Sequence, residues 1–370
     1  MKEPKRLLLV GGGHSHIEVV RRFGMAPPAS CAVVLVSPGR HATYSGMLPG
    51  LIAGHYRFED CHIDLERLCR NAGVAFALDE VVALDPARAR ARGRNGDYPF
   101  DLASLDVGSM PGMAAVPGAA ENAVPARPAS SLLAAWQRML AAPRPIAIVG
   151  GGAGGVELAL AMHHRIEREG AAPDISIVTD TPEVLPSHPP AARRVLVRIL
   201  GERGIAVHAS SRVVGVERAV LHLDGGRRLA ADHVVWATTA AAPAWLAESG
   251  LAVDDGGFVA VDETLRSITH ARVFAAGDCA AVVGHPRPKS GVHAVRQGPP
   301  LAENLARALR GEALLRHKPQ RHALALISTG GRHAVVSWNG IALGGAWAWR
   351  WKDRIDRRFV ATYRTQAVRD

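Results

Sequence analysis

One local pattern occurs twice in this sequence, and it restricts the fold more than any other feature. An apolar run, a glycine-rich turn and a helical stretch follow one another at 6–23 and again at 146–168. Each copy is followed by a second apolar run, at 31–37 and at 174–180. A strand, a crossover helix and a parallel strand form a right-handed βαβ unit. The repetition therefore predicts an α/β fold with two Rossmann-like units.

The second turn has the full dinucleotide-binding spacing, because Gly150, Gly152 and Gly155 form G-x-G-x-x-G. The first glycine permits a tight turn, the second lets the backbone approach a pyrophosphate, and the third allows close packing of helix on strand. The helix N-terminus adds a partial positive charge. Asp180 ends the next strand, where a carboxylate would accept a ribose hydroxyl. The alternative is a glycine-rich corner that binds nothing.

The first turn is less regular. Gly11 and Gly13 are in place, but His16 occupies the third position, which predicts a helix that packs slightly further from its strand. Ser37 ends the second strand where an acid is expected. A serine hydroxyl is a weaker ribose partner than a carboxylate. As one half of a pair, this turn also indicates a dinucleotide site.

Composition excludes several classes of protein. The net charge is +10, but only five of the 44 basic residues are lysines, and we interpret the arginine excess as compositional bias rather than as a nucleic-acid or lipid surface. The four cysteines form no C-x-x-C pair, which argues against a zinc ribbon and fits a reducing cytoplasm. Neither His14-x-His16 nor Cys61-His62 is completed by further ligands, so no metal site is expected. No apolar run reaches the length of a membrane span.

The segments between and after the two units also show recognisable patterns. A passage rich in proline, alanine and glycine covers 110–128, and a helix is predicted over 130–142. Further strands are expected at 74–78, 81–84, 213–216, 228–236 and 272–276, and a further helix at 301–310.

With both turns placed, the chain resembles the pyridine nucleotide-disulfide oxidoreductase flavoproteins. It is most similar to type II NADH dehydrogenases and to the NADH-dehydrogenase-like proteins found alone or fused ahead of selenide, water dikinase. The resemblance covers essentially the whole chain. It rests on GGGHSH at 11–16, YSGMLPG at 44–50, GGGAGGVE at 150–157, VFAAGDCA at 273–280 and GVHAVRQGP at 291–299.

The resemblance implies two cofactors, FAD and NAD(P)H, and a division of the chain. A discontinuous FAD domain would comprise 1–128 and 245–320, an inserted NAD(P)H domain 129–244, and a small C-terminal region 321–370. NADH is favoured over NADPH because the Asp180 carboxylate would repel a 2′-phosphate, although Arg193 and Arg194 could reverse this preference.

The same resemblance assigns residues to the two cofactors and to the reacting centre. The expected FAD contacts are Gly11, Gly13, His14, Ser15, Ser37, Ser45, Gly46, Pro49, Val82, Gly277 and Asp278, the last on the ribitol. The expected NAD(P)H contacts are Gly150, Gly152, Gly155, Asp180 and Thr238. Glu157, Arg296 and Gln297 are expected beside the isoalloxazine, where they would position groups or handle protons. For Glu157 the alternative is a helix N-terminal carboxylate stabilised by the dipole.

Two features depart from the family pattern. An Ala-Thr-Gly element reads Ala237-Thr238-Thr239, so Thr239 replaces a glycine and would crowd the nicotinamide path. No cysteine pair matches a disulfide or sulfide reductase, and Cys279 is expected to be buried packing rather than a redox centre.

The C-terminal segment 346–360 is predicted to form an amphipathic helix. Trp347, Trp351, Ile355 and Phe359 recur every four residues and would share one face. The residues expected on the charged face are Arg350, Lys352, Arg354, Arg357 and Arg358 with Asp353 and Asp356. Such a helix suits a membrane interface, which would place the protein at the inner face of the membrane. The alternatives are docking on its own core or on a homodimer partner.

The expected activity is that of an FAD-dependent NAD(P)H dehydrogenase. Hydride would pass from NADH to flavin N5, and electrons would then pass to an acceptor, with quinone favoured. Two alternatives remain: a flavoprotein reductase of a sulfur or selenium species, and a non-catalytic FAD- and NAD-binding sensor or assembly factor.

Overall fold

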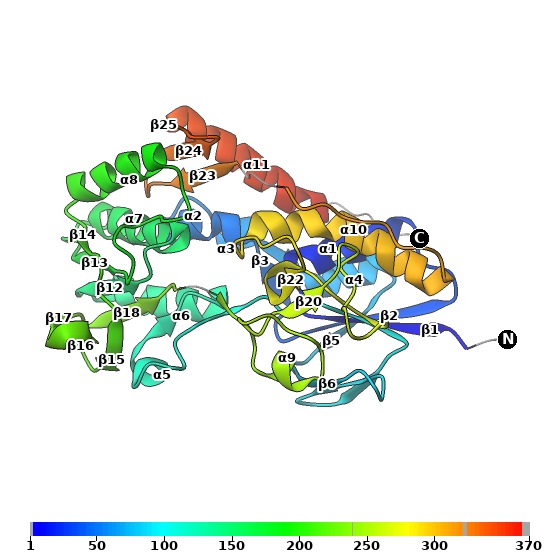
Figure 1. Ribbon diagram of the computed structural model, residues 1–370. Coiled ribbons are helices and arrows are strands. Elements are labelled where there is room, and N and C mark those ends of the chain that lie inside the picture. Colours follow the sequence, from blue (N-terminus) through cyan, green and yellow to red (C-terminus); the bar gives the residue numbers. More distant parts are fainter. Residues whose placement is uncertain (1–2, 239, 321–323, 365–370) are drawn as a thin grey trace.

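The computed structural model describes residues 3–238, 240–320 and 324–364. Two α/β units lie side by side, and the C-terminal segment runs along one face of both (Figure 1). Each unit is centred on a five-stranded parallel sheet. The predicted α/β class with two Rossmann-like units is confirmed.

The first sheet contains the strand that leads into the Gly11 turn. β1 pairs with its neighbours in parallel, with Val10 opposite Val36 and Leu105. Its last four residues are buried, because both faces of a parallel sheet are covered by helices. The strand order is β21 (Val273–Ala275), β9 (Leu102–Leu105), β1 (Lys5–Val10), β2 (Cys31–Ser37) and β5 (Ala75–Leu78).

The second sheet repeats this arrangement around the Gly150 turn. Val149 lies opposite Val178 and Trp236, again in parallel. The strand order is β11 (Val124–Pro125), β18 (His233–Trp236), β12 (Ile146–Val149), β13 (Ile175–Val178) and β14 (Ala206–His208). β11 therefore joins the second sheet although it precedes residue 129, the limit expected from the sequence.

The chain passes between the units at one short antiparallel pair, β10 (Met110–Pro111) and β19 (Ala240–Ala241). The second unit is thus inserted within the first. The remaining strands form small sheets: β3 (His41–Thr43) with β4 (His62–Asp64); β6 (Val81–Asp85), β7 (Arg90–Gly93) and β8 (Asp97–Pro99); β15 (Val213–Glu217), β16 (Val220–Leu223) and β17 (Arg228–Ala230); β20 (Val259–Val261) with β22 (Ala280–Val282); β23 (Ala325–Ser328), β24 (Ala334–Trp338) and β25 (Ile341–Gly345).

Helices pack against these sheets and meet at the junction of the units. The helices are α1 (His14–Met25), α2 (Leu48–Ile52), α3 (Phe58–Cys61), α4 (Leu65–Ala72), α5 (Ala119–Asn122), α6 (Ala129–Ala141), α7 (Ala153–Arg168), α8 (Pro190–Glu202), α9 (Trp245–Glu248), α10 (Gly291–Arg310) and α11 (Ala346–Arg364). Although α2 belongs to the first unit by sequence, Leu48 and Ile52 are buried in the core of the second. The preceding loop is thereby fixed at the junction.

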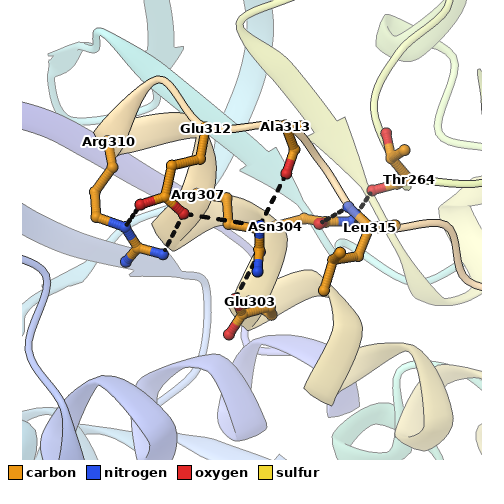
Figure 2. Close-up of polar contacts among 8 residues, drawn as sticks. All are labelled: Thr264, Glu303, Asn304, Arg307, Arg310, Glu312, Ala313 and Leu315. Carbon is orange, nitrogen blue, oxygen red and sulfur yellow. Dashed lines mark hydrogen bonds and ion pairs between the residues drawn. The ribbon is translucent and has the colours of Figure 1, made fainter.

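The helix expected at 301–310 begins ten residues earlier, at Gly291, and runs through Pro299 and Pro300. Prolines remove backbone donors, which is why the sequence suggested a later start. The helix packs along α1 and is held near its C-terminal end by buried Asn304. The Asn304 amide donates to the carbonyl oxygens of Thr264 and Leu315, at 2.9 and 2.8 Å, and accepts from the Leu315 amide at 2.8 Å (Figure 2).

α11 extends from the β23–β25 sheet, beside the second unit, to β4 in the first (Figure 1). Trp347, Trp351 and Ile355 are 41–47% exposed, as the four-residue spacing predicts. Phe359 is not: it is half-buried and stacks on Tyr44 at 4.3 Å. Four residues turn a helix by roughly 400°, so the stripe drifts by about 40° at each step and rotates inward by its fourth member.

Two charged residues of α11 also differ from the expectation. Lys352 and Asp356 were expected on the solvated face, yet their side chains are 11% and 5% exposed and form an ion pair of 2.7 Å. Within the described residues, no helix combines the length and apolarity needed to cross a membrane.

Candidate functional site

The first turn is built so tightly that side chains are excluded. Gly11 has φ +93°, and a Cβ there would lie 2.3 Å from the carbonyl oxygen of Asp106. Its amide donates to the Val36 carbonyl oxygen at 2.8 Å. The chain therefore leaves β1 sharply and starts α1 with its first amides directed at the carboxyl edge of the sheet, where ligands of open α/β sheets bind.

The three residues that follow Gly13 have different partners. The His16 ring contacts the Gly11 carbonyl oxygen through Nδ1, at 2.7 Å, and Ser104 Oγ through Nε2, at 2.8 Å. The Ser15 hydroxyl donates to the Ala294 carbonyl oxygen on α10 at 2.7 Å. His16 thus replaces a glycine by bonding across the turn, and Ser15 ties α1 to α10.

His14, unlike Ser15 and His16, has a ring nitrogen without a hydrogen-bond partner in the described part of the chain. Its ring lies 5.6 Å from that of Tyr44 and 6.1 Å from that of Phe359. Its Nε2 atom is buried and has no hydrogen-bond partner among the residues that the structure describes. Burial lowers the pKa of His14 to about 4, so the imidazole is neutral near pH 7. A buried, unsatisfied ring nitrogen is costly unless a bound group completes it.

The end of β2 carries no acid, as the sequence indicates. Ser37 is buried there, with Oγ 3.1 Å from where a Cβ of Gly12 would lie. Asp79 follows β5, the neighbour of β2 in the sheet. It accepts hydrogen bonds from Glu80, Arg94, Asn95 and Tyr98 and organises the loops around β6–β8. The predicted contact Val82 is half-buried on β6.

The Gly277–Asp278 turn follows β21 at the same edge of the first sheet. Gln297 Oε1 accepts a hydrogen bond from the Gly277 amide at 2.7 Å, which joins α10 to this turn. Asp278 forms an ion pair of 2.6 Å with Arg127 and accepts from Ser109 at 3.3 Å. Arg296 is exposed on α10. Gln297 therefore supports the turn, while Arg296 lines an adjacent cavity of about 550 Å³ together with Asp278.

In the second turn, each glycine of the motif has a different environment. Gly150 has φ +128°, and a Cβ there would lie 2.4 Å from the Ala237 carbonyl oxygen. A Cβ on Gly155 would lie 2.0 Å from the Gly150 carbonyl oxygen. Beside Gly152 no other atom of the described chain lies within 4 Å of a Cβ. The first and third glycines serve packing, and the second faces open space where a phosphate could approach.

Residues around the second turn leave its ribose edge accessible. Asp180 is exposed just beyond β13. Arg193 forms an ion pair of 2.5 Å with Glu183, which occupies one of the two arginines that could favour a 2′-phosphate. Thr238 accepts a hydrogen bond from the Trp236 indole at 2.9 Å. Thr239, predicted to crowd the nicotinamide, lies outside the described residues.

Polar groups from three parts of the chain meet between the units. Glu157, on the first turns of α7, accepts a hydrogen bond from the Ser328 amide at 2.7 Å. Lys352 donates to the Gly46 carbonyl oxygen at 2.5 Å as well as to Asp356. Burial raises the pKa of Glu157 to about 7, an effect that Lys352 opposes and Asp356 reinforces. Glu157 is therefore a half-buried carboxyl that is bonded to the Ser328 amide of β23. This contact goes beyond the role of a charge at a helix N-terminus.

The loop before α2 lies at this meeting point. Gly46 supplies the carbonyl that Lys352 binds, and Ser45 Oγ would lie 2.8 Å from a Cβ on Gly291, at the start of α10. Pro49 is buried in α2. Tyr44 packs on Phe359 and hydrogen-bonds to Asp356.

Four site residues were missed by sequence reasoning: Asp106, Arg127, Lys352 and Asp356. Asp106 lies 91 residues along the chain from Ser15, whose amide donates a hydrogen bond to it. Arg127 lies 151 residues from its partner Asp278. Only the four-residue spacing of Lys352 and Asp356 was a usable local signal, since residues so spaced on a helix are neighbours.

The fold and this edge geometry define a two-dinucleotide oxidoreductase scaffold. In the first unit, the glycine turn, the unsatisfied His14 nitrogen and the Asp278 turn fit FAD. In the second unit, the glycine turn fits a nicotinamide dinucleotide. Residues 5–298 match the family described as pyridine nucleotide-disulphide oxidoreductase, and the chain belongs to it.

Individual relatives are more distant. An NADH dehydrogenase-like protein of Mycobacterium tuberculosis is 29% identical over 235 residues, which is 60% of this chain and 59% of the relative. The chain thus matches less than two thirds of that relative's length. The type II NADH:quinone oxidoreductase of Staphylococcus aureus is 24% identical over 340 residues, 84% of each chain.

Solved structures share the fold. The sulfide:quinone oxidoreductase of Aquifex aeolicus superposes with a TM-score of 0.82 at 19% identity, covering 98% of this chain and 92% of that one. The NDH2 of Plasmodium falciparum in complex with NADH gives a TM-score of 0.80 at 14% identity, covering 97% of both chains.

Proposed function

We propose that the protein is an FAD-dependent NAD(P)H dehydrogenase that reduces a quinone. The observation that carries this proposal is the meeting of Glu157, Lys352 and the Gly46 carbonyl at the junction of the two units. A bound flavin would accept hydride from the nicotinamide and pass electrons to the acceptor. Groups from α7, from α11 and from the loop before α2 would then surround the reacting part of the flavin.

The first unit would hold FAD and the inserted unit the nicotinamide cofactor. Gly11, Gly13 and the positive N-terminal end of α1 would receive the FAD pyrophosphate. His14 would direct its unsatisfied Nε2 toward the cofactor, and Asp278, oriented by Arg127, would bind the ribitol. The N-terminus of α10 would place its partial positive charge near the flavin ring.

NADH is the favoured donor. Exposed Asp180 would accept a hydrogen bond from the hydroxyl of the adenine-side ribose and would repel a 2′-phosphate. Because Arg193 is paired with Glu183, its charge is already offset. With one of the two arginines offset in this way, the exposed Asp180 carboxylate supports discrimination against NADPH.

Glu157, Lys352 and Asp356 would handle the protons that accompany quinone reduction. A carboxyl whose pKa lies near 7 can both donate and accept a proton at neutral pH. Lys352 and Asp356 on α11 would maintain the charge balance around it. Reduction of a quinone to a quinol takes up two protons, so the acceptor needs such groups within reach.

An exposed apolar surface supports a lipophilic acceptor and contact with a membrane. We call it the tryptophan patch, and it comprises Trp338, Ile341, Leu343, Trp347, Trp351 and Ile355. Arg350, Arg354 and Arg358 lie exposed on the same helix and would meet anionic lipid headgroups. Because the buried Lys352 side chain lies on the same helix as the patch, next to Trp351 in the sequence, a quinone held in the bilayer would have a short path to Glu157 and Lys352.

Reduction of a sulfur or selenium species by a covalent cysteine route has weaker support. All four cysteines lie within the described ranges and are free thiols, and three of them are buried. Burial raises the pKa of Cys61, Cys69 and Cys279 to about 12, so none is a thiolate at neutral pH.

The test is the absorption spectrum of the purified protein, recorded anaerobically before and after addition of NADH. A flavin spectrum that bleaches, and recovers on addition of a quinone, is the expected result. Bound flavin that neither NADH nor NADPH bleaches would favour the non-catalytic sensor. A chain that binds no flavin after reconstitution with FAD would overturn the proposal.

A further inference from the structure

The two dinucleotide turns are built alike except at one position. In the first, the Asp106 amide donates to the Val10 carbonyl oxygen at 2.8 Å; in the second, the Ala237 amide donates to Val149 at 2.7 Å. The carbonyl oxygens of Asp106 and Ala237 also block a Cβ on Gly11 and Gly150 in the same way. Asp106 and Ala237 are therefore equivalent, and one turn carries a carboxyl where the other has a methyl group.

The Asp106 carboxyl occupies the phosphate end of α1. Its Oδ2 accepts hydrogen bonds from the amides of Ser15, at 2.8 Å, and His16, at 3.0 Å. A Cβ on Gly13 would lie 2.3 Å from this carboxyl, and one on Gly277 would lie 2.2 Å from Oδ1. Gly152, the counterpart of Gly13, faces open space instead. The glycines of the first turn thus accommodate an acid as well as a cofactor.

An ionised carboxyl in this position would oppose the ligand. The pyrophosphate of a dinucleotide binds at such a helix end because the amides and the dipole attract anions. Asp106 is 3% exposed and forms no ion pair with any residue in the described part of the chain, so its charge would be poorly screened. A protonated carboxyl would instead accept the two amides on Oδ2 and donate its proton from Oδ1.

We propose that Asp106 is a phosphate ligand of the FAD site that acts as the neutral acid, so that binding of the FAD pyrophosphate takes up one proton whenever Asp106 is ionised beforehand. The proton comes from solvent and rests on the carboxyl, and no other bond forms or breaks. This inference rests on the proposed assignment of FAD to the first turn.

The surroundings of Asp106 agree with this assignment. Burial raises the pKa of Asp106 to about 7, the Ser15 and His16 amides oppose that shift, and nearby Asp278 adds to it. The rings of His14 and His16 are neutral, because burial lowers both pKa values to about 4. The Cys279 thiol is also neutral, and Arg127 is paired with Asp278. Among the residues that the structure describes, no cation is paired with Asp106 to hold it in its charged form.

The test is the pH dependence of FAD affinity in the full chain stripped of flavin, measured by quenching of flavin fluorescence from about pH 5 to 9. For the wild type, we expect a flat dissociation constant below about pH 7 and a weakening of about tenfold per pH unit above it. In Asp106→Asn, the amide keeps a donor and an acceptor but cannot ionise, so the affinity should not change with pH. NADH binding to the second turn of the same wild-type chain serves as the internal control and should also be flat.

A second measurement needs no variant. Calorimetric titration of the wild type with FAD, in two buffers of different ionisation enthalpy, counts the protons taken up. About one proton well above pH 7, and none well below it, is expected. FAD binding with no pH dependence and no proton uptake would overturn the role of Asp106 and leave the proposed function intact. Absence of FAD binding at every pH would overturn both.

Discussion

At the scale of single residues, Glu157 has the most informative titration. Burial raises its pKa to about 7, so it is protonated below that pH and ionised above it. If it supplies protons to the acceptor, the rate of quinone reduction should fall as pH rises through 7. Glu157→Gln should remove this limb of the profile and slow quinone reduction by about 10². Stopped-flow absorbance of the reduced flavin, mixed with quinone, would measure both.

Glu167→Gln is the matched control for that experiment, because Glu167 lies on the same helix and is exposed. It should leave both half-reactions unchanged. Reduction of the flavin by NADH should also be nearly unaffected in Glu157→Gln. An equal loss in both half-reactions would contradict a proton-handling role and indicate that Glu157 mainly supports the packing of β23.

The glycines of the second turn should separate stability from ligand binding. A Cβ on Gly155 would strike the Gly150 carbonyl oxygen, so Gly155→Ala should lower the free energy of unfolding by about 1–3 kcal/mol. Gly152 has φ −71° and open space, so Gly152→Ala should fold normally and weaken NADH binding by obstructing the phosphate. Thermal melts without nucleotide and NADH titrations would distinguish the two effects. Equal melting temperatures for both variants would refute this division of roles.

What the sequence revealed at this scale was set by distance along the chain. Gly11, Gly13, Gly150 and Gly155 belong to short motifs whose geometry is local, so the sequence alone indicates the two tight turns. Asp106 reaches its partners from a different strand of the same sheet, and no short pattern marks such a residue. Contacts of this kind become visible only when strand order is known.

At the scale of elements, the C-terminal half of α10 is tied to neighbouring segments by one buried polar side chain. Asn304 makes three hydrogen bonds, to Thr264 and Leu315 (Figure 2). Asn304→Leu keeps the volume but leaves buried backbone groups without partners, which should destabilise the protein by about 2–3 kcal/mol. Chemical denaturation monitored by circular dichroism would measure this change.

Arg310→Ala is the control, since its ion pair with Glu312 lies in the same region but at the surface (Figure 2). Exposed pairs contribute little, so its denaturation midpoint should match that of the wild type. A larger loss for Arg310→Ala than for Asn304→Leu would show that the surface pairs, rather than the buried amide, hold the end of α10.

Elements were predicted well where periodicity was strong and less well where tertiary contacts dominate. The strand at 31–37 and the helix near 130–142 are confirmed almost to the residue. The start of α10 was missed because Pro299 and Pro300 suggested an interruption, whereas packing on α1 carries the helix through. In α11 the four-residue spacing identified the helix but not which charges face inward, since Lys352 and Asp356 are paired only through the fold.

At the scale of the whole molecule, the tryptophan patch should decide where the protein resides. Trp347→Ser combined with Trp351→Ser removes two exposed rings that stack on each other, so the fold should be retained. We expect the double variant to lose binding to vesicles containing anionic lipid, while NADH oxidation with a water-soluble acceptor is unchanged. Sedimentation with vesicles would measure the loss.

Val197→Ser and Val207→Ser form the control pair for that measurement, because both side chains are exposed hydrophobics of the second unit outside the patch. Their variant should sediment like the wild type. Failure of the wild type itself to bind vesicles, together with a dimer in solution that the tryptophan changes dissociate, would assign the patch to a second copy of the chain.

The course of α11 across both units has a mechanical consequence. The helix packs on β24 beside the inserted unit and on β4 in the first, so it acts as a brace between them (Figure 1). Any rotation that opens the junction must shear one of these two contacts and strain the Lys352 bridge to Gly46. Exchange of the nicotinamide product should therefore proceed by small local movements within a stiff frame, and the two cofactors would keep a constant separation throughout turnover.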